Sequence, residues 1–334
     1  MSSAIPAATP AATADPAPAR NRFRFVERSR VRWAEVDLQG IVFNGHYLMY
    51  FDTAVAGYWR ALAMPYHDTM QALQGDLYVR KATLEYEASA RYDEQLEVGV
   101  RCAAIGRTSM RLQCAVFRGD RRLVHGELVY VFADPATQTS RPVPAALRDW
   151  FEAYESGAPM VDVQVGPWDT LGEAASAVRH AVFTREQGID AALDHDGADA
   201  DAVHVLARNR AGTALGTGRL LRHAPGIGRI GRLAVVASMR GTSIGRRMLD
   251  SLVTAARERG DREAMLHAQT TALDFYRRQG WQPRGEAFTE AGTVGAGILT
   301  SAALTQDAWI VVTWTTATSA ASHTQVWTLA YTLA

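Results

Sequence analysis

The sequence predicts two domains of different architecture: an α+β domain with an antiparallel sheet around a long central helix, then an α/β domain with a mixed sheet flanked by helices. Three observations lead to this prediction. A strongly apolar helix over residues 45–63 precedes four strand-like segments, a proline-containing break follows them, and the second half of the chain alternates strands with helices. The length of 334 residues also exceeds that of one usual domain.

The charge balance and the two cysteines narrow the class of protein. The sequence has 35 Lys and Arg against 35 Asp and Glu, so it has no overall basic field that would attract nucleic acid or an anionic membrane. Cys102 and Cys114 stand in strand-like runs without the spacing of a metal site, which favours a buried reduced pair in a cytoplasmic protein. We therefore expect no metal and no nucleic-acid partner.

The first 21 residues are rich in Ala, Pro and Thr. They lack the basic start and the continuous apolar core of a signal peptide, so residues 1–21 are expected to be a disordered leader. Since no later apolar run reaches the length needed to cross a bilayer, we expect no membrane span.

The first domain, expected over residues 22–156, is built around the apolar helix of residues 45–63. Apolar side chains occur on every face of that helix, which predicts that it is buried. A strand-like segment that begins at Val31 ends at Asp37 before the helix, and four strand-like segments follow it. These segments are Leu77–Glu87, Leu96–Ala104, Ser109–Phe117 and Arg121–Ala133, with Gly119-Asp120 as a hairpin turn between the last two.

Proline residues end the first domain and a second pattern begins. Pro142 and Pro144 precede an amphipathic helix over residues 145–154, and residues 157–160 are expected to be a linker. The second domain is expected over residues 161–292. Its predicted strands are Val161–Val165, Val203–Arg208, Leu215–Leu221, Arg229–Val236 and Ala264–His267, and its predicted helices are Leu171–Glu186, a helix from Gly245 to about Arg259, and Thr271–Gln279.

The last segment, residues 293–334, differs in composition from the rest of the chain. Its only formally charged residue is Asp307, while Thr, Ala and Trp dominate. We expect a divergent uncharged tail, in which Ala308–Thr313 and Val326–Thr332 could pair as strands.

The stretch Val31–Asp52 places a carboxylate and a turn directly before the apolar helix. The informative residues in it are Asp37, Gly40, Asn44, Tyr47 and the pair Tyr50-Phe51. Their types and spacing resemble the active-site region of hotdog-fold acyl-CoA thioesterases of the 4-hydroxybenzoyl-CoA thioesterase superfamily, in particular the tol-pal-associated branch. The resemblance implies that Asp37 either attacks the thioester carbonyl or activates a water. Without it, Asp37 reads as a turn residue that caps a helix.

Further roles in the first domain also follow from the resemblance. The helix N-terminus at Asn44, Gly45 and Tyr47 would hold the thioester oxygen on backbone N–H groups, with Asn44 as the capping residue. Ser109 would lie near the acyl-CoA, although an ordinary strand hydroxyl is an equal reading. Members of this fold share their sites across a two-fold axis, so a homodimer or homotetramer is expected. We interpret Glu35 and Asp52 as surface charges.

The second half resembles a GNAT acetyltransferase, most closely the small ElaA-like branch. The segments that carry the likeness are His180–Asp190, Arg229–Val235, Leu266–Gln269, Phe275–Trp281 and Pro283–Glu286. Such enzymes hold the pyrophosphate of acetyl-CoA on the backbone at the start of a helix. The coenzyme A contacts implied here are Leu233, Val235, Arg240, Gly241, Ser243, Ile244, Gly245 and Arg246.

Two features of this second domain remain open at the level of sequence. Ser243 replaces a glycine of the phosphate-binding pattern, and a positive φ there would cost Ser more than Gly. Tyr276 would protonate the departing thiolate of coenzyme A, or would be a half-buried helix tyrosine. Candidate general bases are Glu186, His267 and Glu290, and no spacing selects among them.

The sequence as a whole therefore predicts a bifunctional enzyme of coenzyme A thioesters. An acyl-CoA thioesterase that uses Asp37 would be fused to an N-acetyltransferase that uses acetyl-CoA and an amine-bearing small molecule or peptide. The alternative is a thioesterase whose second domain binds coenzyme A or a partner without turnover.

Overall fold

A computed structural model describes residues 18–194, 196–269, 272–283, 288–290, 293–302, 310–314, 316–318 and 321–323. The chain divides into two compact units, which we call unit 1 (residues 1–62 and 66–158) and unit 2 (residues 63–65 and 159–334). The leader expected over residues 1–21 falls mostly outside the described residues, and Arg20–Arg22 forms a short 3-10 helix. The possible strand Val326–Thr332 also lies outside them.

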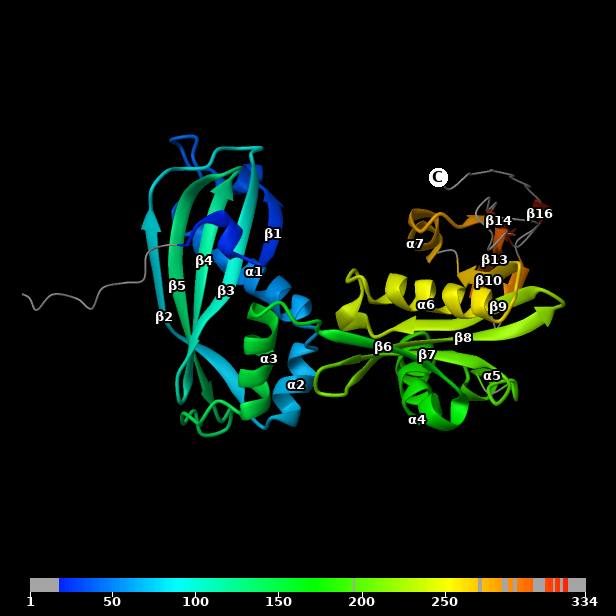
Figure 1. Cartoon of the computed structure of the whole chain (residues 1–334). Coiled ribbons are helices and arrows are strands. Elements are labelled where there is room, and N and C mark those ends of the chain that lie inside the picture. Colours follow the sequence, from blue (N-terminus) through cyan, green and yellow to red (C-terminus); the bar gives the residue numbers. More distant parts are fainter. Residues whose placement is uncertain are drawn as a thin grey trace, which may run out of the picture. The chain divides into compact units, whose positions relative to one another are not determined.

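Unit 1 contains a five-stranded antiparallel sheet with the strand order β1-β3-β4-β5-β2 (Figure 1). Its strands are β1 (Phe25–Arg30), β2 (Asp76–Tyr86), β3 (Gln95–Ile105), β4 (Ser109–Arg118) and β5 (Arg121–Ala133). The four segments predicted after the helix all form strands, and buried and more exposed residues alternate over most of β5, as expected for a strand with one covered face. β1 and β2 form the two edges of the sheet.

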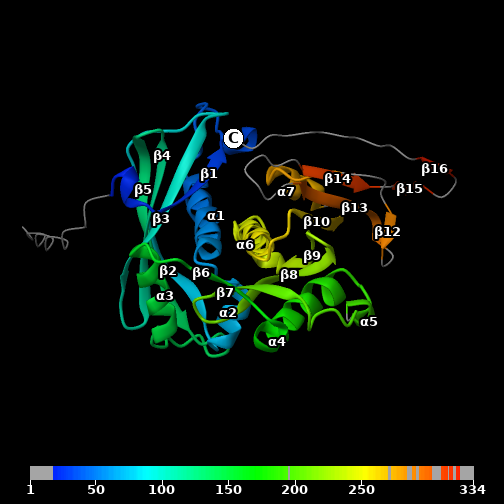
Figure 2. The ribbon, with the colours of Figure 1, turned by 45° about the vertical axis from the view of Figure 1, so that its right-hand side comes forward.

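The helix α1 (His46–Ala61) runs along the sheet of unit 1 and packs on β1, β3 and β4 (Figure 2). Its C-terminal half is held by α3 (Ala145–Glu155), since the rings of Tyr58 and Phe151 lie 5.8 Å apart. A third helix, α2 (Tyr66–Ala72), lies between α1 and β2 in the chain. The helix prediction is therefore confirmed in its position and in most of its burial.

Two expectations for unit 1 are wrong in detail. The segment from Val31 to Asp37 is no strand, because the first strand is β1 and a 3-10 helix, η2 (Trp33–Glu35), follows it. The helix α1 is also not buried on every face, since Leu48 and Met49 are exposed. These two apolar side chains on a surface indicate that α1 covers its own sheet with one face only.

Unit 2 contains a mixed sheet whose main path is β11-β13-β10-β9-β8-β7-β6. Only β9 and β10 pair in parallel among these described strands. The strands are β6 (Val161–Gly166), β7 (Val203–Asn209), β8 (Ala214–Ala224), β9 (Ile227–Val235), β10 (Glu263–Gln269), β11 (Gln282–Pro283), β12 (Phe288–Glu290), β13 (Thr293–Ala302), β14 (Ile310–Trp314), β15 (Thr316–Thr318) and β16 (Ala321–His323).

Helices cover both faces of the unit 2 sheet, with α4 on one face and α6 on the other (Figure 1). The helices are α4 (Trp168–Arg179), the π-helix η3 (His180–Glu186), α5 (Ala191–Asp194), the 3-10 helix η4 (Ala237–Met239), α6 (Ile244–Glu258) and α7 (Leu273–Arg278). The predicted helix over residues 171–186 thus forms as α4 and then changes to π geometry. Such a change of helical geometry is frequent at functional sites.

The uncharged segment after residue 292 contributes to this sheet. β13 pairs antiparallel with β10: Glu263 lies opposite Ala302 at one end and Gln269 opposite Ala296 at the other. β14 pairs with β13 in turn. β14 overlaps the strand proposed at Ala308–Thr313. Because β13 borders β10, this segment covers an edge of β10 that would otherwise present unpaired backbone groups.

The cysteines and the helices bear on the expected class of protein. Cys102 and Cys114 are buried and free, on β3 and β4. No helix within the described residues is long and apolar enough to cross a membrane. Within the same residues, no cluster of three or more His, Cys, Asp or Glu side chains could hold a metal ion.

Candidate active sites

Asp37 lies at the start of a tight turn that leads into α1. Val36 and Val42 pair across the turn, Asp37 N donates to Ile41 O at 2.9 Å, and Gly40 adopts a φ of +71°. The Asp37 Oδ1 atom accepts a hydrogen bond from Gln39 N at 2.8 Å, and the side chain is partly exposed. The carboxylate therefore has a turn-stabilising contact and still reaches solvent.

The N-terminus of α1 differs from the expectation for Asn44. The capping position is Gly45, and no side chain caps the helix there. Asn44 instead offers its main-chain oxygen, which accepts from Tyr86 Oη at 3.1 Å and from Tyr47 N at 3.4 Å. A helix end without a side-chain cap leaves backbone N–H groups for another acceptor.

Tyr47 stabilises the N-terminus of α1 through hydrogen bonds within the protein. Its side chain is buried, and its hydroxyl accepts from Ala90 N at 2.8 Å. Burial raises the pKa of Tyr47, and its ring meets those of Tyr50 and Tyr86 edge to face. The Tyr47 N–H already donates to Asn44 O. Of the three residues predicted to hold the thioester oxygen, Tyr47 is therefore the one whose backbone N–H is taken, and the role is left to the Gly45 end of the group.

Glu35, interpreted from sequence as a surface charge, is buried and holds the turn to the helix. Its carboxylate accepts from Tyr50 Oη at 2.7 Å and from Arg32 N and Nε, each at 2.7 Å. Burial acts to raise the pKa of Glu35, but these hydrogen bonds outweigh it and the pKa is lowered. The surface-charge interpretation is wrong because the partner, Tyr50, lies fifteen residues away and leaves no local pattern.

Ser109 lies at the other end of the unit 1 sheet from the N-terminus of α1. Ser109 pairs with Val131 on β5, whereas Tyr86, which contacts Asn44, pairs with Val124 on the same strand. The interval between these β5 positions corresponds to roughly 23 Å at strand spacing. Within one chain, the structure does not bring Ser109 to Asp37.

In unit 2 the parallel strands β9 and β10 diverge. They pair only from Ile227 opposite Glu263 to Ile230 opposite Leu266. β9 stays paired with β8 as far as Val235. A bulge in β9 accompanies this divergence, and Arg232 there has a φ of +52°. The segment of β9 after Ile230 therefore presents a backbone edge that β10 does not cover.

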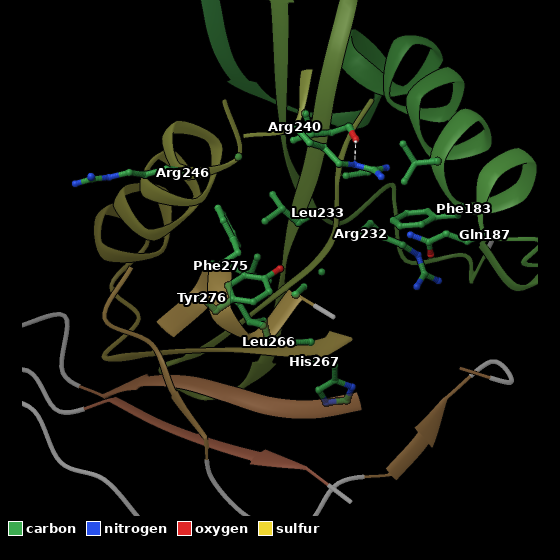
Figure 3. A pocket seen from close by; sticks show the side chains of 18 of the residues that line it. Phe183, Gln187, Arg232, Leu233, Arg240, Arg246, Leu266, His267, Phe275 and Tyr276 are labelled. Atoms are coloured by element: carbon green, nitrogen blue, oxygen red, sulfur yellow. Dashed lines mark hydrogen bonds between the residues drawn. The ribbon is translucent and has the colours of Figure 1, made fainter. Parts of the chain in front are cut away.

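A cavity of about 980 Å³ lies at this divergence. Leu233 and Val235 line it from β9, Leu266 and His267 from β10, and Tyr276 from α7. Figure 3 shows Arg246 on one side of the cavity, Arg232, Gln187 and Phe183 on the other, and Tyr276 with Leu233 in between. Gly241, Ser243 and Gly245 also line it, so most of the predicted coenzyme A residues meet here. Ile244 is an exception, since its side chain is buried in the core.

The phosphate-binding pattern forms a strain-free helix start. Ser243 is the N-cap of α6 with a φ of −74°, so the feared cost of a serine at positive φ does not arise, and Gly241 carries the positive φ of +77°. A Cβ on Gly245 would lie 3.3 Å from Phe275 Cζ and 3.6 Å from Val235 Cγ2. A larger residue at 245 would therefore push the Phe275 ring aside by a few tenths of an ångström.

The two arginines of this pattern have different environments. Arg240 forms a two-pronged ion pair with Glu186 at 2.5 and 2.6 Å and donates through Nε to Val235 O at 3.0 Å. These hydrogen bonds from Arg240 hold the pKa of Glu186 below its usual value. Arg246 is exposed and extends away from the cavity centre (Figure 3). Arg240 therefore fixes the loop, while Arg246 is available to solvent anions.

The structure separates the candidates for proton transfer. Tyr276 is buried and lines the cavity, and burial raises its pKa. His267 also lines the cavity, with Nδ1 at 3.4 Å from a terminal nitrogen of Arg229. Glu186 is committed to Arg240, and the side chain of Glu290 lies outside the described residues. Of the two candidate bases whose side chains the structure describes, Glu186 and His267, His267 is the one that lines the cavity.

A buried ion network beside the cavity was not expected from sequence. It alternates three arginines with three aspartates: Arg179, Arg219, Arg232, Asp194, Asp196 and Asp199. Arg179 is only 1% exposed and binds two of these aspartates. Charges buried as deeply as Arg179 must be paired, and the ion pairs join all six side chains, although Asp196 is exposed and Arg232 partly so. Asp194 and Arg232 also line the cavity.

Comparison with known proteins adds independent findings for both units. A model of the thioesterase superfamily matches residues 39–125, and a model of the acetyltransferase (GNAT) domain matches residues 171–296. The chain is 27% identical over 122 residues to the acyl-CoA thioester hydrolase YbgC of Escherichia coli, which covers 35% of this chain and 88% of that protein. It is 31% identical over 116 residues to a Bacillus subtilis protein named "uncharacterized N-acetyltransferase YjcF", which covers 34% and 81%. The solved PA5185 protein of Pseudomonas aeruginosa aligns at 27% identity and a TM-score of 0.37, over 43% of this chain and all of that one.

Proposed function

We propose which residues carry out the two activities of this chain. Residues 39–125 belong to the thioesterase superfamily and residues 171–296 to the GNAT acetyltransferase domain family, so the chain is a thioesterase fused to an acetyltransferase. In unit 1, Asp37 is the carboxylate of thioester hydrolysis, either as nucleophile or as the base that activates water. The uncapped end of α1 at Gly45 polarises the thioester carbonyl. The substrate of this unit is an acyl-CoA.

The active unit 1 site is proposed to need a second copy of the chain. β2 is an edge strand of the unit 1 sheet. Its residues Val79 and Tyr86 are exposed, as are Leu48 and Met49 of α1, so both elements carry apolar side chains at the surface. Pairing of β2 with β2 of a second copy about a two-fold axis would place the Tyr86 end of one strand beside the Tyr78 end of the other. Since Ser109 lies at the Tyr78 end of its own sheet, Ser109 of the partner subunit would approach Asp37. A homodimer, or a homotetramer of two such pairs, follows.

In unit 2, acetyl-CoA is proposed to bind in the divergence of β9 and β10, which is the observation that carries the assignment. The backbone of β9 at Leu233, which β10 does not cover, would take a pantetheine amide, because unpaired strand groups need partners, whereas Val235 O already accepts from Arg240. The start of α6 at Ser243–Gly245 would take the pyrophosphate, with charge from Arg246, while Arg240 shapes the loop.

The chemical step in unit 2 requires a base for the amine and an acid for the thiolate. We assign the acid to Tyr276, because it lines the cavity and burial keeps it protonated. His267, on the facing strand, is assigned as the base, directly or through a water. The amine then attacks the acetyl carbonyl, and coenzyme A leaves as the thiol.

Both activities are tested on the full chain with two separate readouts. Release of free thiol from acyl-CoA without amine reports hydrolysis, and N-acetylated product detected by mass spectrometry reports transfer. We expect an Asp37 variant to lose the first and a cavity variant to lose the second. Transfer that never occurs, although coenzyme A binds at Ser243–Gly245, would leave unit 2 as a binding domain without turnover.

A further inference from the structure

Arg232 occupies the side of the unit 2 cavity that lies opposite the phosphate end. Figure 3 places it with Gln187 and Phe183, across Tyr276 and Leu233 from Arg246. If coenzyme A enters by its phosphates at the start of α6, this opposite side receives the reacting groups beyond the thioester. The inference below rests on that proposed binding mode.

The guanidinium of Arg232 is partly used by the protein. Its Nε lies 3.0 Å from Asp194 Oδ1, and Nη2 donates to Leu193 O at 3.0 Å and lies 3.3 Å from Asp196 Oδ2. Within the described residues Nη1 has no hydrogen-bond partner, and it is absent from the buried unpaired atoms, so it faces solvent. The side chain is 26% exposed and lines the cavity.

Each carboxylate around Arg232 is paired with at least one arginine, although Asp194 Oδ1 and Arg232 Nε make an ion pair without a hydrogen bond. Arg179 Nε donates to Asp194 Oδ2 at 2.7 Å, Arg219 binds both oxygens of Asp196, and Asp199 accepts from Arg179 and Arg219. Hydrogen bonding by Arg219 lowers the pKa of Asp196, so the Asp196 carboxylate stays ionised over a wide pH range. The network therefore offers the cavity a guanidinium donor, while the one carboxylate that lines the cavity, Asp194, is already ion-paired with Arg179 and Arg232.

The backbone of Arg232 has an unusual conformation that points to a ligand site. A φ of +52° is costly for a residue with a long side chain, and such conformations concentrate at ligand sites. The network fixes the side chain, so little conformational entropy remains to be lost when a ligand binds. A planar, pre-oriented guanidinium is suited to a carboxylate.

We propose that Arg232 binds a carboxylate of the reacting pair, so that the acetyltransferase acts on an amine that itself bears a carboxylate. Phe183, Ile189 and Leu193 line the cavity too, and they suit an apolar body between the two polar groups. An apolar α-amino acid has this chemistry. The same carboxylate could instead be carried by the acyl group of the donor, as in succinyl-CoA, and the experiment separates these sources.

The test compares L-leucine with L-leucinamide as acceptors of acetyl-CoA, with N-acetylated product measured by mass spectrometry. We expect the ratio of kcat/KM for leucine over leucinamide to fall at least about tenfold in Arg232→Gln, which corresponds to about 1.4 kcal/mol. Comparing this ratio between the wild type and the variant cancels the difference in amine basicity between the two acceptors, because that difference is the same for both proteins. Arg232→Lys, which keeps the charge but not the fork, should give an intermediate ratio and guards against misfolding of the Gln variant. Arg257→Gln, an exposed change on α6 outside the cavity lining, should leave the ratio unchanged.

A second comparison varies the acyl donor: leucinamide is the acceptor, and acetyl-CoA is compared with succinyl-CoA. A preference for succinyl-CoA that depends on Arg232, without any preference for leucine, would place the carboxylate on the acyl group and overturn the acceptor assignment. Unchanged ratios in both arms would overturn the carboxylate site itself, while transfer to leucinamide would still support the proposed function.

A binding arm keeps the two proposals distinguishable when no amine is acetylated. N-acetyl-leucine and N-acetyl-leucinamide are titrated by calorimetry into the full chain loaded with coenzyme A. Preferential binding of N-acetyl-leucine to the wild type but not to Arg232→Gln would uphold the carboxylate site and count against catalysis. Equal binding of both compounds to the wild type would overturn the inference whatever the activity.

Discussion

The two candidate sites differ in how much of each is assembled by a single chain. In unit 2 the residues expected to bind coenzyme A surround one cavity, because β9 and β10 separate inside one sheet. In unit 1, the Asp37 turn leads into the start of α1, which Tyr86 contacts, whereas Ser109 lies toward the other end of the sheet. The positions on β5 that pair with Tyr86 and Ser109 are roughly 23 Å apart by strand spacing. Residues of one sequence motif can therefore meet around one cavity, as in unit 2, or stay apart within one chain, as in unit 1, where we propose that a second copy completes the site.

The largest effect is expected from Asp37→Ala, which should separate the two sites chemically. Loss of a positioned acid–base group should lower kcat for thioester hydrolysis at least about a hundredfold. N-acetylated product formation by unit 2 should stay unchanged. The matched control is Asp120→Ala, another turn aspartate, which should retain hydrolysis. A folded Asp37→Ala protein with near-wild-type hydrolysis would remove Asp37 from the mechanism.

Gly245→Val should act in the opposite sense, on unit 2 alone. Its Cβ would lie 3.3 Å from Phe275 Cζ, and the added methyl groups would force Phe275 to move in the cavity wall. Overpacking of this kind destabilises the fold by about 1–3 kcal/mol. The displaced Phe275 and the valine side chain would also crowd the start of α6, so coenzyme A affinity measured by calorimetry should fall about tenfold or more, with hydrolysis unchanged.

Ser243→Gly is the matched control for that change. Because Ser243 already has an ordinary φ of −74°, glycine relieves no strain, and affinity should stay within about threefold of the wild type. Affinity that ignores both substitutions would mean that the phosphate site lies elsewhere.

A charge on the free edge of unit 1 should test whether its site needs a second copy. Val79→Lys places a cation on exposed β2, where edge lysines oppose strand pairing. Light scattering should report a smaller assembly, and hydrolysis should fall at least about tenfold because misplaced groups lose positioning. Val165→Lys, on exposed β6 of unit 2, is the matched control. A monomeric variant with full hydrolysis would refute the shared site.

The smallest expected effect concerns stability, through Glu35→Gln. Loss of the charge-assisted bonds to Arg32 and Tyr50 should destabilise unit 1 by about 1–3 kcal/mol at pH 7, measured by denaturant unfolding. Since the folded pKa of Glu35 is lowered, its stabilisation is present above the unfolded value of about 4.3 and is lost as pH falls through the folded value. The difference between wild type and variant should therefore shrink below about pH 4. Glu152→Gln, exposed on α3, should show no such dependence.

Local pattern predicted most of the elements of both units. Arg121–Ala133 coincides with β5, and the helix expected over residues 45–63 is α1 with two residues fewer at its C-terminal end and one at its start. These succeed because alternation and helical periodicity are set by residues close in the chain. The capping role of Asn44 failed because Gly45, one residue later, begins the helix with its main chain alone.

The sequence by itself determined the order of elements, the two families and the residue types at both sites, since each depends on neighbours within a few positions. Only the tertiary structure decided how those residues are used. Glu35 meets Tyr50, Arg240 meets Glu186, and Arg232 joins Asp194 through contacts between residues 15 to 54 positions apart. Such pairs carry no periodic signal, because their partners are chosen by the packing of whole strands and helices. The same packing opens β9 from β10 and leaves the edge of β2 free, which no local pattern encodes.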